Sequence, residues 1–134
     1  KGEIIKDDSE KVEVVIDIKI PAYIPERYIV DEVTKLNVYK QIASISTEDE
    51  KKDLIDEIED RFGNMPQEVM NLISVSMIKT YAEAMYIRKI QERGPQIVFD
   101  FGKGGPKPIT IYKRSGIPVL EDIADFLFAM SQKK

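Results

Sequence analysis

The 134 residues include no cysteine and no histidine. Without cysteine, the chain has no disulfide framework, no thiolate nucleophile, no cysteine-ligated zinc and no iron–sulfur cluster. Without histidine it has no imidazole base, which excludes the Ser-His-Asp and Cys-His catalytic constellations. Any chemistry would have to use carboxylates, lysine, tyrosine, or serine and threonine hydroxyls.

Long apolar runs are also missing. No stretch reaches the ~18 consecutive apolar residues of a membrane-spanning helix, and residues 1–11 lack the apolar centre of a signal peptide. The sequence starts at Lys1 rather than at methionine, so we expect a piece of a larger polypeptide. The absence of cysteine is compatible with a cytosolic protein. We therefore expect no membrane partner, and a cytoplasmic location is compatible with the composition.

What is present fits one soluble domain. The hydrophobic fraction is 43% and the charged fraction is 33%, which is a globular rather than a disordered balance. The 24 acidic residues outnumber the 20 basic ones, which argues weakly against a dedicated nucleic-acid module. We expect residues 1–11 to be a linker or N-terminal extension and residues 12–134 to form a single domain.

The first half of the chain changes from strand to helix periodicity. Residues 12–20 alternate and predict a strand with one apolar face. Prolines four residues apart make residues 21–29 extended. From residue 30 the apolar residues recur every three to four positions and predict an amphipathic helix. The expected apolar positions of the strand and this helix are Val12, Val14, Ile16, Ile18 and Ile20, then Val33, Leu36, Tyr39, Ile42 and Ala43.

Two further helices have clear end signals. Thr47 and Glu50 form a capping-box pattern, so a second helix starts after Thr47 and runs to about Arg61, with Gly63 as its stop. Pro66 suits the first position of a third helix, which runs to about residue 85. That helix is apolar on most sides, so we expect it at the centre of the core.

The second half of the chain predicts three strands and a last helix. The strand candidates are residues 86–90, 95–101 and 108–114, the last two as a hairpin, and a helix follows Pro118. On this helix we expect Glu121, Asp122 and Asp125 to face solvent. The element order β-α-α-α-β-β-β-α predicts an α+β fold, with a small antiparallel sheet packed against four helices.

No cofactor motif is complete. The segment 102–108 superficially resembles a phosphate-binding loop, but it lacks G-x-x-x-x-G-K-[ST] opening a helix, so we interpret it as a turn. No carboxylate spacing matches a metal or glycosidase pattern. We therefore expect no catalytic residue, no cofactor and no metal in this chain.

The acidic charge is concentrated on one helix. Residues 47–61 carry eight acidic and three basic side chains. At about 100° per residue, the apolar side chains gather on one side of this helix and four carboxylates on the other. The apolar side chains are Leu54, Ile55, Ile58 and Phe62, and the carboxylates are Asp53, Asp56, Glu57 and Asp60. This carboxylate face is either solvated or a docking surface for a partner that carries arginine.

The basic charge is concentrated later. Residues 87–114 carry seven basic and two acidic side chains. The basic ones include Arg88, Lys89, Arg93, Lys103 and Lys107. An accessory nucleic-acid-binding module is therefore an alternative function, although strand alternation does not place these side chains in one obvious patch.

Three segments carry a family resemblance. AYIPERYI, KLNVYKQIASI and LIDEIEDRFGNMPQEVMNLI resemble, in order and spacing, the C-terminal TRCF domain of the bacterial transcription-repair coupling factors, the Mfd family. Residues 60–66 are the most specific part. The motif residues are Tyr23, Ile24, Pro25 and Tyr28, then Arg61, Phe62, Gly63 and Pro66. We expect the first four to brace the first strand against the helices, and the others to turn one helix into the next. Members of the family often carry an additional helix and loop between the last two strands, which residues 102–107 replace here.

The resemblance implies that residues 12–134 are a single C-terminal regulatory domain with a non-catalytic, autoinhibitory interaction role. Its parent would be a bacterial, ATP- and Mg-dependent DNA translocase that removes stalled RNA polymerase and recruits nucleotide-excision repair. The domain would dock on an N-terminal UvrB-like module of the same chain, mask the binding of UvrA and restrain the motor. By motif, the acids that face arginines of that module correspond to Glu57 and Asp60, which lie on the carboxylate face found from helix geometry.

Overall fold

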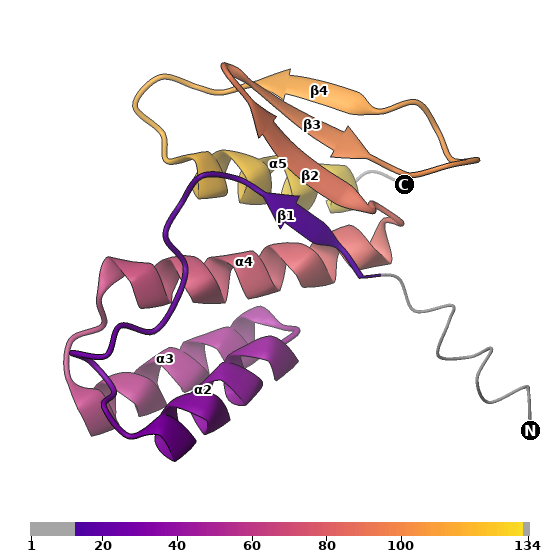
Figure 1. The fold of residues 1–134 in the computed structure, drawn as a ribbon. Coiled ribbons are helices and arrows are strands. Elements are labelled where there is room, and N and C mark those ends of the chain that lie inside the picture. The colour runs from indigo at the N-terminus through magenta and orange to yellow at the C-terminus, as the bar shows by residue number, and fades with distance from the viewer. Residues whose placement is uncertain (1–12, 133–134) are drawn as a thin grey trace, which may run out of the picture.

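The computed structural model describes residues 13–132, which form four helices and one four-stranded sheet (Figure 1). The α+β class and the predicted element order are both confirmed. The predicted linker, residues 1–11, lies outside the described residues. The elements are β1 (Val15–Asp17), α2 (Glu32–Ser44), α3 (Glu48–Phe62), α4 (Gln67–Ala84), β2 (Lys89–Arg93), β3 (Gln96–Asp100), β4 (Ile109–Tyr112) and α5 (Val119–Gln132).

The sheet is mixed, which corrects the prediction of an antiparallel sheet. Its strand order is β1-β2-β3-β4, and β2, β3 and β4 pair antiparallel. The short strand β1 pairs parallel to β2, with Val15 opposite Lys89. Three helices separate these two strands in the chain, and a long crossover of this kind is what a parallel pair requires.

The molecule has a layered arrangement. Helices α4 and α5 lie against one face of the sheet, and α2 and α3 lie on the far side of α4 (Figure 1). One buried apolar cluster joins the sheet to α4 and α5, and a second joins α2, α3 and α4. Helix α4 supplies Ile78 and Ala82 to the first cluster and Val69 and Ile73 to the second. This confirms α4 as the centre of the core.

The predicted apolar face of α2 is partly wrong. Val33 and Leu36 are 68% and 55% exposed, whereas Val38 and Ile42 are buried. Both sets recur every three to four residues, so periodicity alone permits either face. Helix α2 packs on α3 and α4 through Val38 and Ile42, which leaves the Val33 side in solvent.

Two details at the ends of other elements also differ from prediction. The strand predicted over residues 86–90 starts only at Lys89, because Tyr86 and Ile87 form the turn that ends α4. Asp122, expected in solvent, is 4% exposed. Its carboxylate accepts a hydrogen bond of 2.8 Å from the backbone N–H of Arg114 and pairs with the guanidinium of that residue. Burial is tolerated because the charge is paired and hydrogen-bonded.

Candidate docking surface

Helix α3 has a hydrogen-bonded cap at each end. The hydroxyl of Thr47 accepts from the backbone N–H of Glu50 at 3.1 Å. The carboxylate of Glu50 in turn accepts from the backbone N–H of Ser46 at 2.8 Å, one residue before the expected partner, and this hydrogen bond lowers the pKa of Glu50. At the other end, the N–H of Gly63 donates to the carbonyl of Glu59 at 2.9 Å. Both predicted ends of this helix are therefore confirmed.

The carboxylate stripe of α3 faces outward. We use this name for Asp53, Asp56, Glu57 and Asp60, all of which are exposed. The opposite side of the helix buries Leu54 and Ile58 in the core. Among residues 13–132, the stripe has no hydrogen-bond or ion-pair partner. Four uncompensated carboxylates on one rigid element can attract a cationic partner without first breaking internal contacts.

Part of the stripe borders a hollow between α2 and α3. Asp53 and Glu57 line this depression of about 270 Å³, whereas Asp56 and Asp60 do not. Its opposite wall is formed by Gln41 and Ser44 of α2, two residues that helix periodicity did not identify. They become visible as site residues only when α2 is placed beside α3.

The corner after the stripe is fixed by the aromatic motif. The hydroxyl of Tyr28 donates a 2.7 Å hydrogen bond to the carbonyl of Gly63. The ring of Tyr28 lies 5.8 Å from that of Phe62, and the guanidinium of Arg61 lies 4.8 Å above the Phe62 ring. Burial, followed by the nearby charge of Glu59, raises the pKa of Tyr28.

The rest of the proline-containing segment fastens the same group of helices. Ile24 is buried, and its N–H donates to the hydroxyl of Tyr39 on α2 at 2.9 Å. Pro25 is buried beside it, whereas Tyr23 is 46% exposed. Pro66 stands at the N-cap of α4. Thus the segment braces the α2–α3–α4 end of the molecule, and the predicted bracing of the first strand is wrong.

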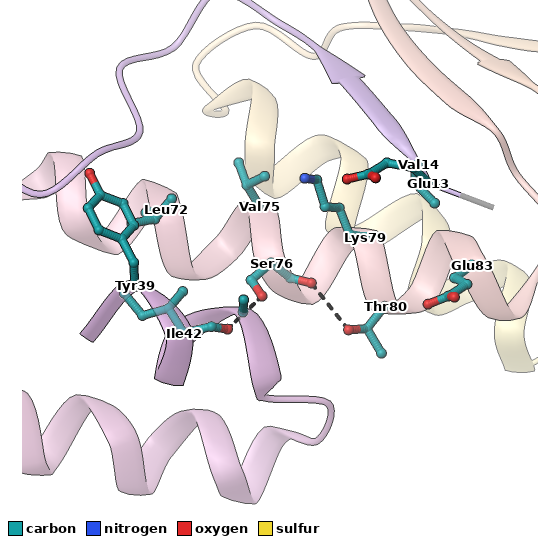
Figure 2. A pocket seen from close by; sticks show the side chains of 11 residues that line it. Glu13, Val14, Tyr39, Ile42, Leu72, Val75, Ser76, Lys79, Thr80 and Glu83 are labelled. Atoms are coloured by element: carbon teal, nitrogen blue, oxygen red, sulfur yellow. Dashed lines mark hydrogen bonds between the residues drawn. The ribbon is translucent and has the colours of Figure 1, made fainter. Parts of the chain in front are cut away.

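A larger groove lies between α2 and α4, next to Val14 (Figure 2). Its volume is about 460 Å³. The hydroxyl of Ser76 donates to the carbonyl of Ile42 at 2.7 Å, and that of Thr80 donates to the carbonyl of Ser76 at 3.2 Å. These hydroxyls help to hold α2 against α4, and among residues 13–132 neither is hydrogen-bonded to a carboxylate.

The basic residues do not form one patch. Arg88 and Lys89 lie at the start of β2, and Arg93 lies at its far end. Lys103 and Lys107 lie on the connection from β3 to β4, at the same end of the sheet as Arg88 (Figure 1). A nucleic-acid surface at the Arg88 end of the sheet would therefore not include Arg93.

Two general features of the described residues bear on function. Within residues 13–132, no three acidic side chains converge in a way that could hold a metal ion. Over the same range, no helix combines the length and apolar character needed to cross a membrane.

Comparison with known proteins decides the family. A family model described as the TRCF domain matches residues 18–112, well over half of the chain. The chain belongs to the TRCF domain family. The match includes the proline-containing segment, α2, the carboxylate stripe and β2 to β4. Helix α5 lies outside the matched residues, although it buries Leu120, Ile123 and Leu127 in the core.

Bacterial relatives agree with this TRCF assignment. The chain is 42% identical over 92 residues to the transcription-repair-coupling factor of Bacillus subtilis (strain 168) and 36% identical over 94 residues to that of Staphylococcus aureus (strain USA300). These alignments cover 69% and 70% of this chain, but the chain spans only 8% of the length of either relative.

A solved structure agrees as well. The crystal structure of a C-terminal domain of transcription-repair coupling factor aligns with a TM-score of 0.65 and 29% identity, over 69% of this chain and 58% of that one. The predicted family resemblance and α+β fold are thereby confirmed.

Proposed function

We propose that this TRCF domain is a non-catalytic interaction module that restrains its parent protein by docking within the same chain. The observation that carries the proposal is the carboxylate stripe, an exposed row of acids on a helix capped at both ends. Within residues 13–132 these acids have no hydrogen-bond or ion-pair partner. Two of these acids border a hollow. Such a surface suits a partner that presents arginine side chains, because guanidinium and carboxylate groups form paired, charge-assisted hydrogen bonds.

The partner in this proposal is an N-terminal UvrB-like module of the parent protein. Docking would cover the surface of that module that binds UvrA. The parent would be an ATP-dependent DNA translocase of the bacterial cytoplasm that acts on stalled RNA polymerase, and its ATP and Mg would be bound by a motor elsewhere in the chain. Family membership and the similarity to named coupling factors support this placement.

The test reverses charge on the stripe. In the intact parent protein, Glu57→Arg combined with Asp60→Arg should raise basal ATPase activity and expose UvrA binding. With the separate domain, titration against the N-terminal module should show binding by the unmodified chain that weakens at high salt and is lost in the double variant. Both side chains are exposed, so the variant should remain folded, with unfolding free energy within about 0.5 kcal/mol of the unmodified chain.

A matched control reverses two exposed acids elsewhere. Glu83→Arg with Glu121→Arg makes the same change in net charge on α4 and α5, away from the stripe. This control should leave ATPase activity and UvrA binding unchanged. Unchanged ATPase activity and UvrA binding in the stripe variant would overturn the proposal, as would an equal effect of the control.

A further inference from the structure

The turn between α4 and β2 contains an unusual backbone conformation. Tyr86 has a φ of 64°, and it is the sole non-glycine residue with positive φ in the described part of the chain. Its N–H donates to the carbonyl of Glu83 at 3.1 Å, and the N–H of Ile87 donates to that of Ala82 at 2.9 Å. This pair of hydrogen bonds is the Schellman ending of a helix, in which the left-handed position is most often glycine.

Packing among residues 13–132 does not account for a tyrosine here. A bulky side chain in the left-handed region is strained, and Tyr86 is 81% exposed. Burial therefore provides little compensation for the strain. Residues held in strained conformations cluster at active sites and ligand-binding positions, where the surrounding structure fixes them. At this turn, glycine would supply the backbone conformation but no ring.

Basic side chains lie at the same end of the sheet. Arg88 starts the chain into β2, and its N–H donates to the carbonyl of Asp100 at 2.7 Å, next to the β3–β4 connection. Gly102 has a φ of 83°, and a Cβ atom there would stand 2.9 Å from the Cγ of Arg88. The Arg88 side chain thus lies closely over Gly102, adjacent to Lys103.

Exposed cations and exposed carboxylates both lie at this end of the sheet. Arg88, Lys103 and Lys107 are exposed and form no ion pair with any residue between 13 and 132. The carboxylate of Asp100 already accepts from the N–H of Gly102 at 2.8 Å. Two further exposed carboxylates lie near the start of β2. They are Glu83 on α4, one turn before Tyr86, and Glu13, two residues before Val15, which pairs with Lys89.

From these observations we infer that Tyr86, Arg88, Lys103 and Lys107 form a binding site for single-stranded nucleic acid. An exposed ring offers a face on which a base stacks without regard to sequence, and neighbouring cations contact the phosphates. An acidic peptide would satisfy the cations but would give the ring no stacking partner. This site is separate from the carboxylate stripe and does not depend on the docking function proposed above.

Binding is tested with the full 134-residue chain and a short fluorescein-labelled oligothymidylate, by fluorescence anisotropy at low salt. The unmodified chain should bind, and the affinity should fall as salt is raised. Tyr86→Ala should weaken binding about ten-fold, and Tyr86→Phe should retain it, because stacking needs the ring and not the hydroxyl. Tyr112→Ala, at a tyrosine that is 66% exposed on β4, is the matched control and should bind normally.

Two further variants separate binding from folding. Tyr86→Gly should weaken binding as much as Tyr86→Ala does, yet unfold at a higher temperature, because glycine relieves the strained backbone. Lys103→Glu with Lys107→Glu should weaken binding and reduce its salt dependence.

Three results would overturn the inference. The first is no binding at low salt, and the second is unchanged affinity in Tyr86→Ala. The third is displacement of the oligonucleotide by polyglutamate as effectively as by unlabelled oligothymidylate, because this would show that the site recognises negative charge alone.

Discussion

The hydroxyl of Tyr28 donates a 2.7 Å hydrogen bond to the carbonyl oxygen of Gly63. This contact ties the extended segment before α2 to the residue that ends α3. Gly63 has a φ of 91°, so the chain turns sharply there towards α4. Because Asp60 stands only three residues earlier, the same contact holds the C-terminal end of the carboxylate stripe in a fixed position relative to the core.

Removal of the Tyr28 hydroxyl should weaken this corner. In Tyr28→Phe the packing against Phe62 is retained and the hydrogen bond is lost, so we expect the unfolding free energy to fall by about 1 kcal/mol. Urea denaturation measures this change. Tyr23→Phe is the control, because the 46% exposed Tyr23 has no hydroxyl hydrogen bond within residues 13–132 and should unfold normally. An unfolding free energy of Tyr28→Phe equal to that of the unmodified chain would show that the hydrogen bond does not stabilise the corner.

The ion pair of Asp122 should make the fold sensitive to acid. Burial alone would raise the pKa of Asp122, but hydrogen bonds from the backbone and side chain of Arg114, with its charge, outweigh this and lower the pKa below 3.8. A depressed native pKa means that the unfolded chain binds more protons. The pair therefore stabilises the fold above pH 3.8, and this contribution is lost as the pH falls through the native pKa.

Asp122→Asn should lower the unfolding free energy at neutral pH by about 1–2 kcal/mol. It should also reduce the loss of stability between neutral pH and pH 3, measured by urea denaturation at each pH. Asp125→Asn, at the exposed second partner of Arg114, should have a smaller effect on both quantities. An unchanged acid dependence in Asp122→Asn would contradict the assigned role of this carboxylate.

The contact between Tyr81 and Glu48 should affect the stability of the fold at alkaline pH. The hydroxyl of Tyr81 donates to the carboxylate of Glu48 at 2.8 Å. Burial, then this hydrogen bond and the charge of Glu48, raise the pKa of Tyr81 to about 12. A raised native pKa stabilises the fold below pH 10, and this contribution is lost as the pH rises through the native value.

Absorbance titration of tyrosinate should show one ionisation near pH 12 that disappears in Tyr81→Phe. The stability of this variant should fall less steeply than that of the unmodified chain between pH 10 and pH 12. A Tyr81 that ionises at the ordinary value of 10.0 would refute the contact.

Glycine at position 86 should stabilise the strained turn between α4 and β2. Tyr86→Gly removes the side chain that disfavours positive φ, and we expect the unfolding free energy to rise by about 1 kcal/mol, which thermal and urea denaturation can measure. Tyr86→Ala keeps a Cβ atom and should gain much less. A loss of stability in the glycine variant would show that the exposed ring contributes to the fold itself.

Helix α3 shows how much of the fold and site could be predicted. Its ends depend on Thr47, Glu50 and Gly63, which act within a few residues, so their pattern is visible in sequence. Its buried and exposed sides follow from the turn angle of a helix. In contrast, Gln41 and Ser44 join the site through the packing of two helices, and no local pattern marks them.

The misassigned residues share one physical cause. Val33 and Leu36 have an apolar spacing that suits a core, yet α2 packs through Val38 and Ile42. Aspartate is usually a surface residue, but Asp122 is buried because the guanidinium of Arg114, eight residues before it, pairs with its charge. In each case the result depends on what the neighbouring elements present to the residue.

By itself, the sequence determined the order and type of the elements, the ends of α3, the outward row of carboxylates and the family resemblance. These depend on interactions within one or two turns and on motif spacing. Tertiary structure alone decided that β1 runs parallel to β2, that the basic residues divide between two ends of the sheet, and that the side chain of Arg88 lies against Gly102, next to Lys103. These features arise between segments far apart in the chain, where contact follows from packing rather than from local periodicity.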